Sequence, residues 1–453
     1  MLERYQALGV YYGNKEVMRQ ETMEQRAIKV AIVNTFQDFG GAAVAAQRLH
    51  KALQDQPLVE PQLLVQVQTQ KQQHLQAVAN TWWGKKRAFL RFTVDRLLFW
   101  RQAKSKATRY AISPAYIGTN ISQHPLIKQA DIIHLHWIVF GFLSLKSLKT
   151  LFALGKPIVW TMHDMWAFTG GCHHARNCDH YQRECGNCVF LKHPHPKDLS
   201  YRIFQRKLTI YKDKSLHLVG CSQWIANEAT KSGLMSAEVS TKSSIQSIPN
   251  PIDTTVYTPL DKKILRQQRS LAVDKKYLLF GSVKISDKRK GIDYFLEALQ
   301  ILKEQYPATL QEVELLVFGG AGAQVKALSP YTVHLQGLLS GDEALRQNYN
   351  LGDALVMPSL EENLPNTIME SMACGTPAIA FDVGGVGDLI DHQQNGYLAS
   401  YKSAEDLAKG IYWTLYQSDN QTLTKNARQK VLDNFTEEVV SNQYVQLYKK
   451  ILD

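Results

Sequence analysis

Two glutamates separated by seven residues, Glu362 and Glu370, are the clearest candidates for chemistry in the sequence. The apolar run Ala354–Ser359 predicts a strand, and Thr367–Cys374 predicts a helix that ends at Gly375. Glu362 should therefore lie in the loop between them, and Glu370 just beyond the first helical turn. The unpaired N–H groups of a helix start suit phosphate, and a carboxylate beside them accepts hydrogen bonds from hydroxyl groups. This combination fits a nucleotide-sugar, although acidic residues also favour helix starts for structural reasons alone.

Two places in the first half of the chain also carry residues suited to ligand binding. Gly40 and Gly41 follow the first predicted strand and would let the backbone approach a ligand closely, although such a pair also makes ordinary turns. His163 and Asp164 end another predicted strand. A histidine there contacts a ligand or makes a structural hydrogen bond, and the residues alone leave both readings open.

Short apolar strands alternate with helices from Ile28 onward, which is typical of parallel sheets with helical crossovers. The first series of predicted strands is Lys29–Asn34, Gln62–Val67, Asp131–Trp137, Pro157–His163, Leu216–Cys221 and Ile245–Pro249. The second is Tyr277–Ser282, Glu314–Phe318, His334–Gly337, Ala354–Ser359 and Ala378–Phe381. Two series in 453 residues predict two doubly wound α/β domains. Neither carries G-x-G-x-x-G after its first strand, which disfavours a dinucleotide-dependent oxidoreductase.

The domain boundaries are expected where this alternation breaks. The predicted parts are an N-terminal extension (1–26), a first domain (27–250), a basic linker (251–273), a second domain (274–432) and a terminal helix (433–453).

Four of the six cysteines lie within one short stretch, as Cys172-x5-Cys178-x6-Cys185-x2-Cys188. In a reduced chain this spacing predicts a structural zinc held by four thiolates. Only one Cys-x2-Cys pair is present, so free or paired thiols and mixed Cys/His ligation stay open.

The chain carries 52 basic and 41 acidic residues, a formal charge of +11, which suggests an anionic partner. Residues 82–110 hold nine Lys/Arg and one Asp, interleaved with Trp and Phe. This mixture predicts an amphipathic helix on an anionic membrane surface, and the alternative is a surface helix with its aromatic residues buried in its own domain. No nucleic-acid-binding motif accompanies it, so we expect no nucleic-acid partner. The N-terminus shows no signal peptide and no window approaches 18 apolar residues, which predicts a cytoplasmic protein.

The motifs around the two glutamates resemble those of a known family. Glu-x7-Glu is followed by Ser-Met-Ala-Cys-Gly-Thr-Pro at 371–377, by Gly384-Gly385 and by Asn395-Gly396-Tyr397. With the two-domain strand pattern, this order resembles the retaining family-4 glycosyltransferases, most strongly over 354–400. The resemblance implies the GT-B fold, in which two Rossmann-like domains face a central cleft and a C-terminal helix crosses back to the N-terminal domain.

The resemblance also implies roles for the charged residues. Glu362 would contact hydroxyl groups of the donor sugar, and Glu370 would hold the ribose. Lys290 matches a lysine that binds the leaving diphosphate, where fixed cations stabilise the developing negative charge. Arg289 or Lys284 would replace the family's arginine, with a solvated charge run as the alternative.

On the other domain, the resemblance places Gly40 and Gly41 at the donor phosphate and acceptor interface. His163 would make transition-state contacts near the reacting carbon of the donor sugar, without a covalent role. Asp164 would orient its ring or bind the acceptor.

The loop after Glu362 departs from the family pattern. Asn363 stands where many members have glycine, and asparagine tolerates a left-handed backbone better than most residues. Pro365 has no N–H, so phosphate contacts should come from Leu364, Asn366 or Thr367.

Together with the residues, the resemblance implies a retaining, nucleotide-sugar-dependent glycosyltransferase of hexosyltransferase type. The resemblance to bacterial exopolysaccharide and colanic-acid-type enzymes implies a lipid-linked saccharide acceptor, a role in exopolysaccharide or O-antigen synthesis, and a peripheral position on the cytoplasmic face of the inner membrane. No cofactor is expected for catalysis. Alternatives are a nucleotide-sugar epimerase on the same fold and a non-catalytic saccharide-binding protein on a decayed transferase fold.

Overall fold

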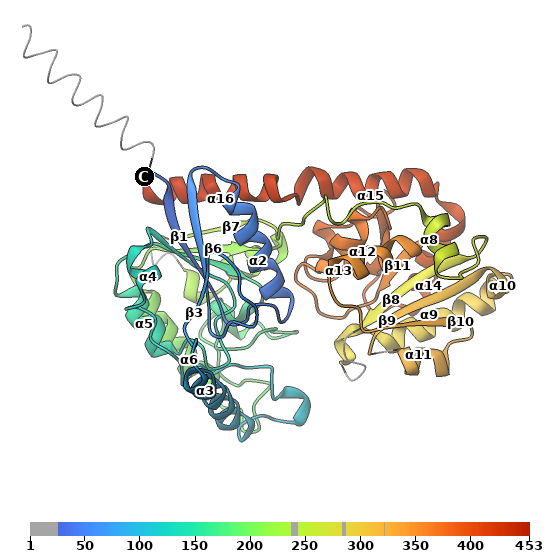
Figure 1. Ribbon diagram of the computed structural model, residues 1–453. Coiled ribbons are helices and arrows are strands. Elements are labelled where there is room, and N and C mark those ends of the chain that lie inside the picture. The colour runs from blue at the N-terminus through green and yellow to red at the C-terminus, as the bar shows by residue number, and fades with distance from the viewer. Residues whose placement is uncertain (1–25, 237–242, 283–286, 321) are drawn as a thin grey trace, which may run out of the picture.

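Runs of β-branched and aliphatic residues form two all-parallel sheets, one in each half of the chain (Figure 1). The computed structural model describes residues 26–236, 243–282, 287–320 and 322–453. The N-terminal sheet has the strand order β3-β2-β1-β4-β5-β6-β7, and the C-terminal sheet has the order β10-β9-β8-β11-β12-β13. Ile32 in β1 and Leu279 in β8 are completely buried because helices cover both faces of each sheet. The predicted fold class, with two doubly wound α/β domains, is confirmed.

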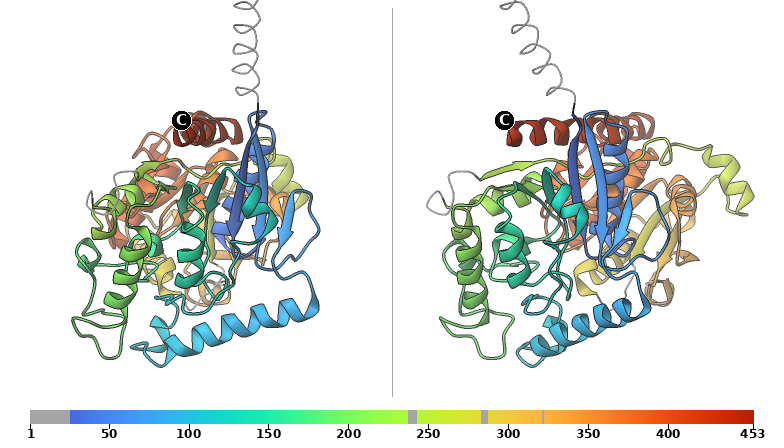
Figure 2. Two further views of the ribbon diagram at one scale, coloured as in Figure 1. Left: turned by 90° about the vertical axis from the view of Figure 1, so that its left-hand side faces the viewer. Right: turned by 60° about the vertical axis from the view of Figure 1, so that its left-hand side comes forward.

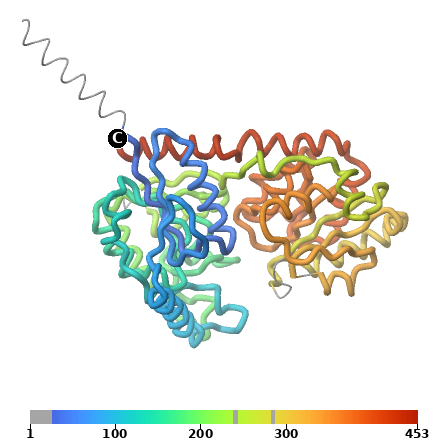
Figure 3. The backbone as a smooth tube through the Cα atoms, in the orientation of Figure 1, coloured from blue at the N-terminus to red at the C-terminus, as the bar shows by residue number. Residues whose placement is uncertain are grey.

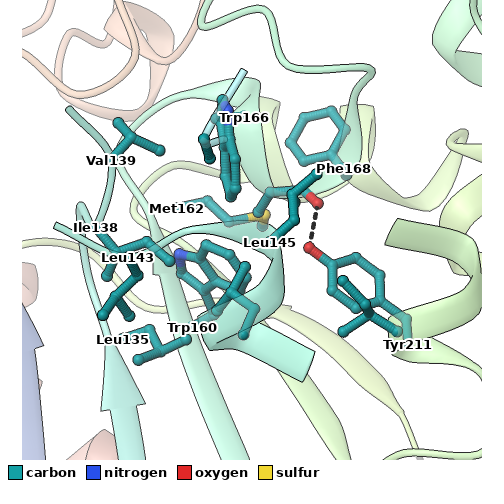
Figure 4. Packing of buried hydrophobic residues seen from close by; sticks show 14 of the residues in the cluster. Leu135, Ile138, Val139, Leu143, Leu145, Trp160, Met162, Trp166, Phe168 and Tyr211 are labelled. Atoms are coloured by element: carbon teal, nitrogen blue, oxygen red, sulfur yellow. Dashed lines mark hydrogen bonds between the residues drawn. The ribbon is translucent and has the colours of Figure 1, made fainter. Parts of the chain in front are cut away.

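The N-terminal domain alternates strands and helices over its whole length. Its strands are β1 (Ile28–Asn34), β2 (Val59–Val65), β3 (Leu75–Ala77), β4 (Ile132–Leu135), β5 (Ile158–Met162), β6 (Leu216–Gly220) and β7 (Ser244–Ser247). Its helices are α2 (Gly41–Gln54), α3 (Trp82–Trp100), α4 (Pro125–Gln129), α5 (Leu145–Phe152), α6 (Leu199–Tyr211) and α7 (Gln223–Thr230). Trp160 of β5 packs in the core with Trp166 and Tyr211, and the Tyr211 hydroxyl donates to the Ala167 carbonyl at 2.9 Å (Figure 4).

The C-terminal domain repeats the pattern. Its strands are β8 (Lys276–Ser282), β9 (Val313–Gly319), β10 (Thr332–Gly337), β11 (Ala354–Met357), β12 (Ala378–Phe381) and β13 (Gly396–Ala399). Its helices are α8 (Lys262–Gln268), α9 (Ile292–Gln305), α10 (Thr309–Glu312), α11 (Gly322–Leu328), α12 (Asp342–Leu351), α13 (Asn366–Ala373), α14 (Ala404–Tyr412) and α15 (Asn420–Asn434).

Every predicted strand is present, with ends that differ by at most three residues. The short strands β3 and β13 were not predicted, because three or four residues carry too little periodicity. The predicted linker 251–273 contains helix α8, which belongs to the C-terminal domain. Within α8, Arg266 is buried and donates to the Leu351 carbonyl and to Asp353.

The last helix, α16 (Glu437–Leu452), lies within the terminal segment 433–453 and returns to the N-terminal domain (Figure 3). The Thr436 side chain accepts a hydrogen bond from the Val439 N–H and caps its start. Val440, Tyr444, Leu447 and Tyr448 form its apolar stripe and pack in one cluster with residues of β1 and α2. The N-terminal core is therefore completed by a segment that follows the whole C-terminal domain.

Helix α3 lies at the end of the N-terminal domain remote from α16 (Figures 1 and 2). Its N-cap is Thr81, whose hydroxyl accepts from the Gly84 N–H at 3.0 Å. Only Ala88, Asp95, Arg96 and Phe99 of its 19 residues are buried. Most of this helix therefore faces away from the domain.

Replacing Leu447 by alanine should open the N-terminal sheet. Leu447 is 5% exposed, and loss of a buried leucine side chain costs about 2–5 kcal/mol. Native-state hydrogen exchange of β1 amides should report this loss, because a protein of two domains need not unfold in one step. Lys450→Ala, on the exposed face of α16, should change the same amides by less than about 0.5 kcal/mol. Unchanged exchange in Leu447→Ala would contradict the role given to α16.

Candidate functional site

The starts of two helices from different domains face each other. Helix α2 begins at Gly41 and helix α13 begins at Asn366, whose side-chain amide lies 3.5 Å from the Gly41 carbonyl oxygen. Gly40 has φ 87°, a left-handed conformation that glycine adopts without strain. Because each helix start carries unpaired N–H groups and the positive end of a dipole, the space between them favours an anion.

Lys290 and Glu362, both predicted site residues, are in contact. The Lys290 ammonium lies 2.5 Å from a Glu362 carboxylate oxygen, although they are 72 residues apart. Lys290 ends the short 3-10 helix Lys288–Lys290, and Gly291 follows it. A Cβ atom on Gly291 would lie 1.8 Å from the Pro358 carbonyl oxygen. Glycine therefore lets the lysine loop pack directly on the chain that leaves β11.

A second pair of glycines supports the Glu362 loop from the other side. A Cβ on Gly384 would lie 1.8 Å from the Glu362 carbonyl oxygen, and one on Gly385 would lie 2.2 Å from that of Asn363. The Gly384-Gly385 motif therefore works by close backbone packing, which fixes the position of the glutamate.

Asn363 connects the two domains. Its Nδ2 donates to the Met162 carbonyl at 3.1 Å, and its Oδ1 accepts from the Ser222 hydroxyl at 2.6 Å. Asn363 is not among the described residues with positive φ, so the tolerance of asparagine for a left-handed backbone does not explain its presence. Both ends of its side-chain amide are needed for the domain contact instead. Since His163 follows Met162, this contact also brings His163 close to the Glu362 loop.

Glu370 is buried and carries two protein partners. One carboxylate oxygen accepts from Arg48 at 2.7 Å, and the other accepts from the Tyr349 hydroxyl at 2.9 Å. Arg48 belongs to α2, so this ion pair also crosses between the domains. A carboxylate has about four acceptor positions, so Glu370 keeps capacity for ligand hydroxyl groups.

The remaining basic candidates differ in their surroundings. Arg289 makes two bonds to Asp287, at 3.0 and 2.8 Å, and lies 3.9 Å from Glu361. Lys284 lies outside the described residues. Lys290 is therefore the basic residue that the structure places directly beside Glu362.

His163 is bonded to another histidine. Its Nε2 lies 2.9 Å from Nδ1 of His136, the residue that follows β4. Burial lowers the pKa of His163 to about 4, despite the nearby charge of Asp164. His163 is therefore a neutral ring at physiological pH.

The hydrogen bonds of the Asp164 carboxylate go to residues other than His163. One carboxylate oxygen accepts from Trp137 Nε1 at 2.7 Å and lies 2.6 Å from His173 Nδ1, and the other accepts from the Trp166 N–H at 2.8 Å. Burial alone would raise the pKa of Asp164, but the His173 contact and the Trp166 bond lower it to about 2. Asp164 thus orients the loop after β5 through these donors.

Of the remaining predicted contacts, Leu364 is buried and Thr367 lies in the first turn of α13. For both, the predicted phosphate contact stays a prediction.

The four clustered cysteines line one cavity of about 20 Å³, together with Tyr181 and Phe190. None of the six cysteines forms a disulfide. Among the described residues, no group of three or more His, Cys, Asp or Glu side chains is arranged to hold a metal ion. The predicted zinc site therefore finds no support in the side-chain geometry, and burial raises the pKa of Cys172, Cys185 and Cys188 to about 12.

Helix α3 exposes large apolar and basic side chains together. Trp82, Trp83 and Phe89 are 62%, 68% and 68% exposed, so the alternative that buries the aromatic residues in their own domain is wrong for these three, whereas it holds for Phe99. The helix ends at Trp100 and does not extend over all of 82–110. Arg96 and Asp95 form a buried pair at 2.8 Å and do not contribute to the surface charge. In the described part of the chain, no helix has the length and apolar content needed to span a bilayer.

Sequence reasoning missed three residues of this site: Arg48, Tyr349 and His136. Arg48 lies two turns beyond Gly41 on a helix that begins with small residues. Its role becomes visible only when the position of α2 beside the C-terminal domain is known. His136 is part of the His-x-His pattern at the end of β4, which places both rings on one side of the sheet.

Two family models match the chain. Residues 39–256 match the model described as "Glycosyltransferase Family 4", and residues 274–417 match "Glycosyl transferases group 1". Together they cover most of both domains.

Curated relatives match parts of the chain. One is the N,N'-diacetylbacillosaminyl-diphospho-undecaprenol alpha-1,3-N-acetylgalactosaminyltransferase of Campylobacter jejuni, 28% identical over 44% of this chain and 50% of that protein. Another is the D-inositol 3-phosphate glycosyltransferase of Paenarthrobacter aurescens, 25% identical over 62% of this chain and 63% of that protein. The chain spans about half the length of the first curated relatives it matches.

Solved structures share the fold. HepE of Anabaena, crystallised with UDP-glucose, has a TM-score of 0.60 and 17% identity over 93% of this chain and all of that chain. Sucrose-phosphate synthase of Thermosynechococcus elongatus has a TM-score of 0.62 and 20% identity, over 93% and 98% of the two chains.

Asp164→Asn should destabilise the loop after β5. An amide accepts hydrogen bonds at only one of the two positions that the carboxylate oxygens occupy, so either the Trp137 and His173 bonds or the Trp166 bond is lost, and the free energy of unfolding should fall by about 2–4 kcal/mol at pH 7. The folded pKa of about 2 lies below the unfolded value of about 4, so the stabilisation is lost as the pH falls through this range. In urea unfolding, the free energies of unfolding of the wild type and Asp164→Asn should therefore become equal as the pH falls. Asp179→Asn, an exposed residue of the neighbouring loop, should differ from wild type by less than about 0.5 kcal/mol at either pH.

Proposed function

The chain belongs to the group 1 and family-4 glycosyltransferases, and on this basis we propose that it moves a sugar from a nucleotide-sugar donor to a saccharide acceptor with retention at the anomeric carbon. One observation carries the assignment of the site. The starts of α2 and α13, the Lys290–Glu362 pair and His163 all lie where the carboxyl ends of the two sheets meet.

The donor is proposed to span this junction. Its diphosphate would lie between the two helix starts, near Gly41, Asn366 and Thr367. Its ribose would bond to Glu370, which Arg48 and Tyr349 hold in place. A nucleotide-sugar fits this arrangement because it combines one doubly charged group with hydroxylated rings on both sides.

The charged groups needed for catalysis are held in place before the donor binds. When a donor binds, its diphosphate attracts Lys290 and its sugar hydroxyl groups replace the lysine as partners of Glu362. As the anomeric bond breaks, negative charge grows on the diphosphate, and Lys290 together with the helix dipoles stabilises it. These groups supply the positive charge themselves, so we propose that transfer needs no cofactor. A zinc ion bound by Cys172, Cys178, Cys185 and Cys188 would order their loop and take no part in transfer.

The acceptor is proposed to be a lipid-linked saccharide in exopolysaccharide or O-antigen synthesis. The names of two relatives support this: the Campylobacter jejuni enzyme is named for a diphospho-undecaprenol-linked sugar, and one of Erwinia amylovora is named for amylovoran biosynthesis.

Helix α3 is proposed to dock on the anionic cytoplasmic face of the inner membrane. Its exposed Trp82, Trp83 and Phe89 suit the interfacial region, and Lys85, Lys86 and Arg87 suit anionic headgroups. The aromatic and the basic side chains both lie in the first two turns of α3.

The alternatives predict different products. An epimerase would release a changed sugar without an acceptor, and a non-catalytic binding protein would release no nucleoside diphosphate at all. The contacts of Glu362, Glu370 and Lys290 favour an active transferase.

Glu362→Gln should lower turnover of a UDP- or GDP-sugar by about 100-fold, because contacts that strengthen in the transition state are lost. Lys290→Ala should weaken UDP or GDP binding by about tenfold in calorimetry, because one charge-assisted bond disappears.

Lys288→Ala is the matched control for both variants, since this exposed lysine lies two residues from Lys290 and its loss should leave turnover and nucleotide affinity unchanged. Measuring the release of nucleoside diphosphate with and without a saccharide acceptor, in EDTA, distinguishes transfer from epimerisation and from binding alone. Wild-type affinity for the nucleotide in Lys290→Ala would remove this lysine from the site.

The triple change Lys85→Gln, Lys86→Gln and Arg87→Gln should release the protein from anionic vesicles. Each basic residue near such a surface contributes about 1 kcal/mol, so binding should weaken by about 100-fold at low salt. The control removes the same charge from Lys425, Lys449 and Lys450 on α15 and α16, across the molecule, and should keep wild-type binding. Donor hydrolysis should survive in both. Equal loss of vesicle binding in both variants would assign attachment to net charge instead of α3.

A further inference from the structure

A second histidine lies directly against His163. The imidazole rings of His136 and His163 meet edge to edge, with ring centroids 5.1 Å apart and planes inclined by 23°. Its Nδ1 lies 2.9 Å from His163 Nε2. The backbone of His136 is fixed at both ends, because its N–H donates to the Val33 carbonyl and its carbonyl accepts from Trp160 Nε1. His136 is therefore a rigid support for the candidate catalytic ring.

Both rings are neutral at physiological pH. Burial lowers the pKa of His136 well below its ordinary value, and the neighbouring rings of His134 and His163 lower it further. The titratable groups around the pair are His134, 4.6 Å from His136 between ring centroids, and Asp164, which bonds to His173. No carboxylate among the described residues bonds to either ring. Each ring thus carries one N–H, and one of them donates to the other.

The surroundings of His136 decide which ring donates. Its Nε2 is buried and has no hydrogen-bond partner among the described residues. A buried N–H without a partner is rarer and costlier than a buried lone pair without one, so the proton of His136 belongs on Nδ1. His136 then donates to His163 Nε2, and the proton of His163 must lie on its Nδ1.

We propose that His136 is a positioning residue that holds His163 in the Nδ1–H tautomer, so that His163 offers a hydrogen-bond donor to the oxygens of the donor sugar. This inference rests on the proposed function. Because Nε2 is bonded to His136, Nδ1 is the ring nitrogen left for the ligand. A neutral donor also avoids a full positive charge beside the anomeric carbon, which becomes electron-poor as the diphosphate leaves.

Substitutions of His136 separate this role from simple packing. Asparagine places an amide N–H where Nδ1–H stands and should keep the tautomer. Aspartate offers only acceptors, so it should move the His163 proton to Nε2 and raise the pKa of that ring. Phenylalanine keeps the ring volume and removes the bond. The matched control is His134→Gln, since His134 is equally buried on β4 but bonds to Tyr448 and Thr161 instead of His163.

Nitrogen-15 NMR of histidine-labelled protein at pH 7 should show His163 protonated at Nδ1 in wild type, His136→Asn and His134→Gln. Its signal is assigned by its absence in His163→Gln. His136→Asp should show the proton at Nε2.

Kinetics with a UDP- or GDP-sugar that the wild type hydrolyses provide a second measurement. His136→Asp and His136→Phe should lower kcat by about 10- to 100-fold with KM within about threefold, and only His136→Asp should shift the pH profile. His136→Asn should stay within about fivefold of wild type.

Two results would overturn the inference. One is a wild-type His163 protonated at Nε2. The other is a kcat in His136→Asp and His136→Phe no lower than in His134→Gln. A wild type that hydrolyses no nucleotide-sugar would count against the proposed function instead, and the NMR experiment would still test the tautomer.

Discussion

The hydrogen bonds of the Asn363 side chain hold the two halves of the site in register. They join the last residue of β5 to the loop after β11, and so place His163 and Glu362 on either side of one contact. The amide is buried, so each of its bonds replaces water and an unpaired group would be costly. The glycine contacts at Gly384 and Gly385, and the packing of Gly291 on Pro358, all serve to keep the backbone around Asn363 in place.

Around this contact, acidic and basic side chains from distant parts of the chain are paired. Glu362 pairs with Lys290, and Glu370 pairs with Arg48 from the other domain. Such pairing limits the cost of placing several charges close together in a partly buried space. The same pairs can exchange partners with a ligand that brings both a diphosphate and hydroxyl groups.

The sequence predicted much of this arrangement because its signals were local. The strand series, the presence of a terminal helix and the adjacency of Glu362 to a helix start follow from periodicity, capping and glycine positions. Contacts between the two domains could not be predicted from such local signals. The side chain of Asn363 was assigned a backbone role, and Arg48 and His136 went unnoticed, because the meaning of each depends on a partner more than 25 residues away. The cysteine spacing is compatible with a metal site, but spacing alone does not fix where the thiols lie, and no group arranged to hold a metal ion is found among the described residues.

The return of α16 has a consequence for the order in which the chain is made. Tyr444 and Tyr448 bond to Thr161 and His134 in the core of the N-terminal domain, yet they are synthesised about 200 residues after its last strand. At about 5–20 residues per second, that interval lasts about 10–40 s on the ribosome. During this time the apolar side chains of β1 and α2 that α16 covers remain open to water or to other chains. The N-terminal sheet is thus translated first, yet the packing of its core is completed only after the domain that follows it has been made.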